Sequence, residues 1–243
     1  MNVSVVIPCY NEEDVLPESY RRFTQVMSST SYEYELLFVN DGSKDRTESL
    51  LLSFAEQDKH VKVLSFSRNF GHQNAVTAGL QHCSGDITVI IDADLQDPPE
   101  VIPQMIETYL REKSNVVYAV RNKREGESFG KLLTAKVYYR MLNYLSDYTF
   151  PVDTGDFRLI DRKVLDTFKR FPEKHKYLRG LFSWMGFKQT PFYYDRHERA
   201  AGKTKYSIRK MFALASIGIF GFSKKPLKLA ISLGTLSIFI AII

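Results

Sequence analysis

The most chemically suggestive stretch of the sequence is ITVIIDADLQDPPE, residues 87–100. Its apolar, β-branched start at residues 87–91 predicts a buried strand, and Asp92, Asp94 and Asp97 follow that strand closely. Where a strand gives way to a loop, Asp92 and Asp94 can converge on one hard divalent cation that also binds the oxygens of a diphosphate. Asp97-Pro98-Pro99 predicts the start of the next helix, which leaves the first two carboxylates for the cation.

The surrounding chain alternates predicted strands and helices. Short apolar runs predict strands at residues 3–7, 35–39, 61–66, 87–91 and 116–120, and helical patterns between them cover 13–27, 47–57, 74–83 and 99–111. This alternation predicts an α/β fold with a mostly parallel sheet and helices on both faces. Each strand is followed by a polar cluster, and ligands of such sheets bind at the carboxyl ends of the strands, so we expect the clusters to form one site. The clusters are PCYNEE, NDGSKDRT, SRNFGHQN, DADLQD and RNKRE.

Three other readings of these motifs fail. A dinucleotide-binding site needs glycines directly after the first strand, and no glycine precedes Gly42. The GKT sequence at 202–204 is typical of the end of a P-loop, but the first glycine of that motif would fall on His197. A haloacid-type phosphatase carries its Asp-x-Asp pair after the first strand, whereas here the pair follows the fourth predicted strand.

Length and composition indicate a globular protein. The 243 residues can form one sizeable α/β domain or two small ones, and 44% of them are hydrophobic. The two cysteines, Cys9 and Cys83, have no metal-ligand spacing, and no signal peptide is recognisable at the N-terminus. We therefore expect two reduced, buried thiols in a domain that faces the cytosol.

The positive charge is concentrated near the C-terminus. Nine basic residues and one acidic residue lie between Arg196 and Lys228, a net charge of +8, while the whole chain carries +5. Such a segment indicates an anionic partner, either nucleic acid or an anionic membrane. Residues 229–243, LAISLGTLSIFIAII, contain no charge and favour the membrane, so we expect no nucleic acid partner.

The C-terminal apolar run is short for a membrane span. As a helix its fifteen residues would reach about 22 Å, against a hydrocarbon core of roughly 30 Å. We expect the beginning of a transmembrane segment at 227–243, cut short at Ile243; a helix buried in the domain is the alternative. The preceding KMFALASIGIFGF predicts an interfacial helix in a region spanning 206–226, with basic flanks on the cytoplasmic side. The catalytic domain would then span 1–205.

As an ensemble, six motifs resemble family 2 glycosyltransferases, in particular the polyprenyl-phosphate branch that includes dolichyl-phosphate mannose synthases. The motifs run in order along nearly the whole chain: VVIPCYNEE, VNDGSKDRT, RNFGHQNAVTAGL, DADLQDPPE, DTGDFRLIDR and RAAGKTKYS. The resemblance implies a GT-A fold, a nucleotide-diphosphate sugar donor, Mg²⁺ or Mn²⁺, and a polyprenyl phosphate acceptor at the membrane. Trp184 stands in LFSWMG and not in the Q-x-x-R-W motif of processive relatives, so synthesis of a polysaccharide is not expected. A homo-oligomer is left open.

The resemblance also implies roles for individual residues. Pro8, Tyr10 and Glu12 resemble the first nucleotide-contacting loop, and Asp41, beside Val39, resembles the acid that accepts a hydrogen bond from the base. The metal and diphosphate segment comprises Asp92, Ala93, Asp94 and Gln96, with Gln96 as a further metal ligand. Contacts to phosphate are implied for Arg121, Arg199 and Lys205.

The chemistry expected of this site is transfer of one sugar with inversion. A cation, Arg121 and Lys205 would stabilise the leaving nucleoside diphosphate. The acceptor phosphate has a second pKa of about 6 and needs little help from a base. Asp156, with Asp153 as runner-up, is the candidate base or orienting carboxylate; a turn-capping role is the alternative. UDP-glucose and UDP-N-acetylglucosamine are the favoured donors, and GDP-mannose is not excluded. Transfer to a non-lipid hydroxyl, or a sugar-nucleotide sensor without turnover, also remains open.

Overall fold

The computed structural model describes residues 1–121, 154–173, 176–195 and 225–242. The chain divides into two compact units. The first contains Met1–Glu125, Asp153–Lys176 and Phe187–Lys203, and the second contains Gly126–Val152, Tyr177–Gly186 and Thr204–Ile243. This division by contacts does not test the predicted division by function. That division, into a catalytic region 1–205, an interfacial region 206–226 and a terminal region 227–243, stays a prediction.

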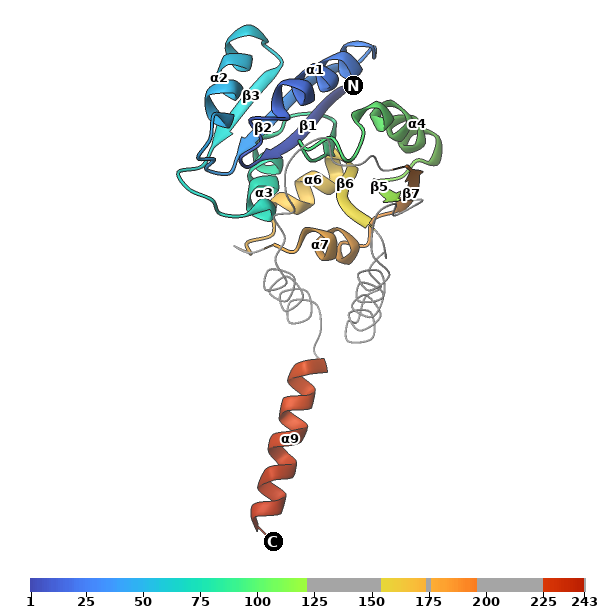
Figure 1. Ribbon diagram of the computed structural model, residues 1–243. Helices are drawn as coiled ribbons and strands as arrows, with labels where there is room; N and C mark the ends of the chain where they lie inside the picture. Colours follow the sequence, from blue (N-terminus) through green and yellow to red (C-terminus); the bar gives the residue numbers. More distant parts are fainter. Residues whose placement is uncertain (122–153, 174–175, 196–224, 243) are drawn as a thin grey trace. The chain divides into compact units, whose positions relative to one another are not determined.

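The first unit is built on a sheet whose seven described strands run in the order β3-β2-β1-β4-β6-β5-β7 (Figure 1). All adjacent pairs are parallel except those that β6 makes with β4 and β5. The five predicted strands are confirmed, whereas β6 and β7 were not predicted. The strands are β1 (Asn2–Cys9), β2 (Glu33–Asn40), β3 (Val61–Ser65), β4 (Ile87–Ile90), β5 (Val116–Arg121), β6 (Thr154–Asp161) and β7 (Gln189–Tyr194).

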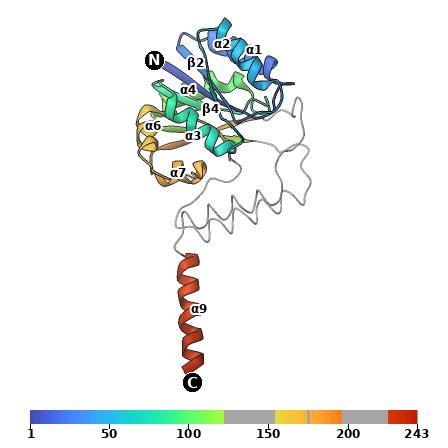
Figure 2. The same cartoon turned by 90° about the vertical axis from the view of Figure 1, so that its left-hand side faces the viewer.

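Helices cover both faces of this sheet, as the strand–helix alternation predicts (Figures 1 and 2). Apolar residues of α1 (Leu16–Ser28), α2 (Thr47–Gln57) and α4 (Ile102–Glu112) join one core cluster with residues of the central strands. The other face carries α3 (His72–His82) and α6 (Arg162–Lys169), which contact each other and the central strands. Cys9 and Cys83 are buried free thiols, which confirms the expectation drawn from their spacing.

The antiparallel strand β6 brings its first residues to the carboxyl edge of the parallel strands. In the β4–β6 register Ile90 is paired with Arg158, so continuing both chains by two residues brings Asp92 opposite Asp156. A residue at the start of β6 therefore meets residues that follow the end of β4. This topology places the DADLQD and TGD motifs at one edge, although 56 residues separate them in the sequence.

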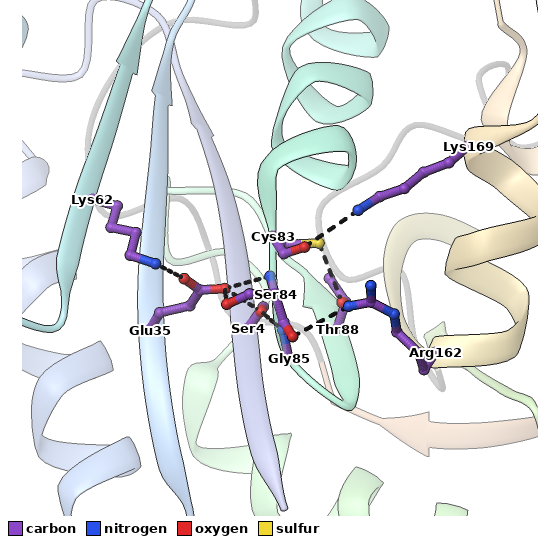
Figure 3. Close-up of polar contacts among 9 residues, drawn as sticks. All are labelled: Ser4, Glu35, Lys62, Cys83, Ser84, Gly85, Thr88, Arg162 and Lys169. Carbon is purple, nitrogen blue, oxygen red and sulfur yellow. Dashed lines mark hydrogen bonds and ion pairs between the residues drawn. The ribbon is translucent and has the colours of Figure 1, made fainter.

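At the opposite, amino-terminal edge of the sheet, the buried carboxylate of Glu35 links neighbouring strands through hydrogen bonds (Figure 3). Glu35 accepts hydrogen bonds from Ser4 Oγ at 2.5 Å, Lys62 Nζ at 2.6 Å and Ser84 N at 2.8 Å. It thereby joins β1, β2 and β3 to the α3–β4 loop. Burial alone would raise the pKa of Glu35, but the hydrogen bonds from Lys62, Ser4 and Ser84 outweigh it and lower the pKa below its usual value.

We expect Glu35→Gln to lower the free energy of unfolding at pH 7 by about 1–3 kcal/mol, because the amide cannot accept all of these hydrogen bonds. Since the folded pKa lies below the unfolded value, the contribution of Glu35 is present above the unfolded pKa and is lost as pH falls through the folded pKa. Urea unfolding of wild type and variant across this range measures the effect. The exposed Glu33 on the same strand supplies the control Glu33→Gln. An effect of Glu35→Gln that does not shrink in acid would contradict this account.

The second unit includes the described helices α7 (Leu178–Trp184) and α9 (Lys225–Ile242). Large apolar side chains of α9 are exposed, among them Leu227, Ile238 and Phe239. In the part of the chain that the structure describes, no helix combines the length and the apolar character needed to cross a membrane. The predicted beginning of a transmembrane segment at 227–243 is therefore not supported, although residues of this region belong to the helix α9. Most of the predicted interfacial region 206–226 lies outside the described residues.

Candidate active site

The loop that follows β4 carries the predicted metal ligands and is held in a defined shape. Ser19 Oγ of α1 donates a hydrogen bond to the Ala93 carbonyl, and Gln96 N donates to Asp94 Oδ1 at 3.2 Å. Leu95, between Asp94 and Gln96, has a φ of 58°, a left-handed conformation that costs an ordinary residue roughly 1–2 kcal/mol. The buried side chain of Leu95 helps to hold the chain in this turn. The loop is therefore fixed before any ligand arrives.

Asp156 lies at the same edge and is held by two residues of α3. His72 Nε2 lies 3.2 Å from Asp156 Oδ2 and 3.7 Å from Asp92 Oδ1, so it bridges the two carboxylates. Gln73 Nε2 donates a hydrogen bond to Asp156 Oδ2 at 3.1 Å. The side chain of Asp156 is only 9% exposed. The structure thus brings the candidate base and the predicted metal segment together, and it adds His72 and Gln73 to the site.

A buried arginine fixes the backbone around Asp156. Arg158 is 4% exposed, and its guanidinium donates to the carbonyl oxygens of Gly155 at 3.0 Å and Asp156 at 3.2 Å. These bonds leave the Asp156 carboxylate to His72 and Gln73. The Asp156 carboxylate contacts two side chains of α3, and its role as base, orienting group or turn cap stays a prediction.

The site concentrates negative charge. Loss of solvent raises the pKa of Asp92 to about 6; attraction to His72 opposes this rise, and the neighbouring Asp94, Asp97 and Asp156 add to it. Such crowding of carboxylates favours a bound cation. The donor set of Asp92, Asp94 and Gln96 consists of oxygen atoms, which suit Mg²⁺ and Mn²⁺.

The described residues contain no group of three His, Cys, Asp or Glu side chains arranged to hold a metal by themselves. A cation held by Asp92, Asp94 and Gln96 would be completed by the oxygens of the ligand's own phosphates. The residues present therefore fit a divalent cation that enters together with a phosphate-bearing ligand.

The loops after β1 and β2 are joined by backbone-to-side-chain hydrogen bonds. Asn11 N donates to Ser43 Oγ at 3.0 Å, and Glu12 N donates to Thr47 Oγ1 at 2.9 Å. Pro8 and Val39 are paired in the register of β1 and β2 and are buried, and Tyr10 and Glu12 are partly exposed. The predicted nucleotide-contacting residues therefore lie together at the carboxyl edge; their contacts with a nucleotide stay a prediction.

Asp41, the predicted hydrogen-bond acceptor for the base, also binds the loop that precedes α3. It is 2% exposed and accepts hydrogen bonds from Asn69 Nδ2 at 2.8 Å, Phe70 N at 2.7 Å and Gly71 N at 3.0 Å. The next residue, Gly42, has a φ of 63°, and a Cβ there would lie 2.3 Å from the Arg68 backbone. Asp41 thus ties the loop that leads into His72 and Gln73 to the end of β2.

Arg121, the predicted phosphate contact, lies in a buried polar cluster. Its Nη2 is 3.7 Å from Asp97 Oδ2, and its Nε donates to Tyr194 Oη at 3.4 Å, while Tyr194 donates its hydroxyl proton to Asp97 Oδ1. A short 3-10 helix, Pro99–Val101, begins where the helix was predicted and leads into α4, but no side chain caps it, so the interpretation of Asp97 as part of a helix start was incomplete. The Asp97 carboxylate accepts a hydrogen bond from Tyr194 and lies beside the Arg121 guanidinium.

Several predicted site residues lie outside the described residues: Asp153, Arg199 and Lys205. Sequence reasoning missed His72, Gln73, Arg158 and Tyr194. The first two stood inside a quoted polar cluster, SRNFGHQN, but helix α3 begins at His72, two residues earlier than predicted. Arg158 and Tyr194 belong to strands that were not predicted.

Comparison with known proteins agrees with this geometry. Residues 4–168 match the domain described as glycosyl transferase family 2. The chain is 55% identical to an uncharacterised glycosyltransferase of Bacillus subtilis (strain 168) over 96% of its length and 72% of that protein. It is 42% identical to a prophage bactoprenol glucosyl transferase homolog of Escherichia coli (strain K12) and 41% identical to the bactoprenol glucosyl transferase of Shigella phage SfV, in each case over 94% of its length and 74% of that protein.

Solved structures share the fold at low sequence identity. Glucosyl-3-phosphoglycerate synthase from Mycobacterium tuberculosis, in complex with Mg²⁺ and UDP, has a TM-score of 0.63 at 21% identity over 90% of this chain and 76% of that chain. A mannosyltransferase from Pyrobaculum calidifontis, in complex with GDP-Man and Mn²⁺, has a TM-score of 0.62 at 19% identity over 90% of this chain and 63% of that chain. With its mostly parallel GT-A sheet and these relatives, the chain belongs to glycosyl transferase family 2 and is a glycosyltransferase.

Proposed function

We propose that the protein is a metal-dependent, inverting transferase that moves one glucose from UDP-glucose to a polyprenyl phosphate. The carrying observation is the carboxylate cluster in which His72 lies between Asp92 and Asp156, because such a cluster favours a cation where a donor diphosphate would lie. The relatives named bactoprenol glucosyl transferases support glucose and a lipid acceptor over the other donors and acceptors considered.

On the donor side, Asp94 and Gln96 would hold Mg²⁺ or Mn²⁺ with Asp92 beside them. The ion would neutralise charge on the leaving nucleoside diphosphate. Arg121 supplies a fixed positive charge at the same edge, because its guanidinium lies against Gly155, next to Asp156. A preorganised cation of this kind stabilises charge that develops on a leaving group without rearrangement of the site.

On the acceptor side, the phosphate is mostly doubly ionised at neutral pH, because its second pKa is about 6. The enzyme therefore needs to orient a nucleophile more than to deprotonate one. Asp156 is suited to this task, since Gln73 holds its carboxylate in one orientation and His72 places a ring nitrogen beside it. Arg199 and Lys205 complete the proposal as contacts to donor or acceptor phosphate.

The location that suits a lipid acceptor is the cytoplasmic face of a membrane. The exposed apolar side chains of α9 and the basic residues between Arg196 and Lys228 support this part of the proposal. An apolar helix flanked by lysines can lie at an anionic interface without crossing it.

A donor and acceptor panel tests the proposed function. Purified protein is incubated with radiolabelled UDP-glucose, UDP-N-acetylglucosamine or GDP-mannose, with undecaprenyl phosphate in detergent and with Mn²⁺ or a chelator. We expect label in the organic phase from UDP-glucose only when both lipid phosphate and metal are present. Transfer that is indifferent to chelator, or label that appears only with a water-soluble hydroxyl acceptor, would refute the proposal.

A further inference from the structure

The Asp97–Tyr194–Arg121 cluster joins three elements that are distant in sequence. Asp97 follows β4, Arg121 ends β5 and Tyr194 ends β7. Asp97 is 3% and Tyr194 is 5% exposed, so both are shielded from solvent, whereas the Arg121 side chain is 19% exposed. The buried pair thus holds a partly exposed arginine.

The contacts form a closed ring. The Tyr194 hydroxyl donates to Asp97 Oδ1 and accepts from Arg121 Nε at 3.4 Å, and the other Asp97 oxygen lies 3.7 Å from Arg121 Nη2. Burial raises the pKa of Tyr194, with the negative charge of Asp97 adding to the rise, so the hydroxyl remains a donor. Both Asp97 oxygens thereby face Arg121 or Tyr194.

The Arg121 guanidinium also lies against a glycine, Gly155. A Cβ on Gly155 would lie 3.0 Å from Arg121 Nη2, so the guanidinium rests against backbone that a side chain would crowd. Gly155 immediately precedes Asp156, which faces Asp92 across His72. The ring therefore holds Arg121 beside the backbone that leads into Asp156, at the edge where the donor diphosphate of the proposed function would lie.

We infer that Asp97 and Tyr194 are positioning residues that orient the Arg121 guanidinium toward the diphosphate of the donor. This inference rests on the proposed function for the identity of that diphosphate. An arginine fixed in one orientation loses less freedom on binding a phosphate than a mobile one. Groups that orient a ligand-binding side chain commonly change affinity by tenfold or more when they are removed.

The test measures binding of UDP and of UMP in the presence of Mn²⁺ by calorimetry, with no lipid present. Tyr194→Phe removes the hydroxyl with its two hydrogen bonds, and Asp97→Asn keeps the shape of the side chain but removes the negative charge that faces Arg121. We expect each to weaken UDP about tenfold and to change UMP affinity less than twofold. Tyr193→Phe, on the neighbouring 62% exposed tyrosine of β7, is the matched control and should change neither.

A double-mutant cycle distinguishes a role of Tyr194 in positioning Arg121 from a general contribution of Tyr194 to stability. In an Arg121→Met background, adding Tyr194→Phe should cause no further loss of UDP affinity, because the group that Tyr194 orients has gone. Gly155→Ala should weaken UDP while Asp97 and Tyr194 remain in place. Three results would each overturn the inference. They are additive losses of UDP affinity in the cycle, equal losses of affinity for UDP and UMP, and unchanged UDP binding by Arg121→Met. Normal results here with no transfer to lipid phosphate would instead count against the proposed function alone.

Discussion

Replacing Asp94 with asparagine is expected to reduce turnover by at least about 10²-fold, because a bound cation contributes several kcal/mol to stabilising the leaving group. The fold should survive, since asparagine can still accept the hydrogen bond that Gln96 N donates to Asp94 Oδ1. One negative charge fewer in the crowded cluster also removes repulsion from Asp92. Steady-state kinetics with UDP-glucose and lipid phosphate measure the loss of turnover, and thermal unfolding measures whether the fold survives.

The matched control for this variant is Asp166→Asn, which makes the same change on a half-exposed side chain of α6 paired with Arg162. It should leave turnover within a factor of two. If Asp94→Asn keeps most of its activity, or if its loss is accompanied by unfolding, the assignment of Asp94 to a cation site is wrong.

Asp156→Asn is expected to lower kcat by roughly 10²-fold, with the KM for the donor little changed. The reason is orientation: the amide matches the carboxylate in size but changes its contacts with His72 and Gln73. The remaining activity should still rise through about pH 6, because that rise belongs to the acceptor phosphate. A pH profile of kcat for wild type and variant measures this.

The control for Asp156 lies on the same strand. Asp161 ends β6 and caps α6 by accepting a hydrogen bond from Val164 N at 2.8 Å, a role that asparagine performs about as well. Asp161 Oδ2 also accepts a hydrogen bond from Asn115 Nδ2 at 2.7 Å, so Asp161→Asn should keep activity at a small cost in stability. Loss of the rise near pH 6 in Asp156→Asn would contradict the assignment of that rise to the acceptor phosphate.

The parallel part of the fold could be predicted from sequence because each strand is a short, buried apolar run that ends in polar residues. For α2 even the bounds, Thr47 and Gln57, agree with the prediction. The strand β6 could not be predicted this way. TGDFRLID mixes charged and apolar residues, and its place between β4 and β5 depends on pairing between residues far apart in the chain.

The site was predictable where a motif is local and less so where partners come from elsewhere. Asp92, Asp94 and Asp156 were singled out from their own motifs, and the structure places them at one edge. The function of Asp97 was missed because its partners, Arg121 and Tyr194, lie on strands that reach it only in the fold. His72 was missed because a histidine at a helix start carries no local sign that two carboxylates will face it.

The central claim is that the carboxylate edge after β4 holds a divalent cation that binds the donor diphosphate. Anomalous diffraction from a crystal grown with Mn²⁺ and UDP tests it most directly. The account predicts one manganese peak within ligand distance of Asp94 and Gln96, shared with oxygens of the diphosphate, and no such peak in Asp94→Asn. Bound UDP with no manganese at this edge, or manganese bound elsewhere in the chain, would contradict it.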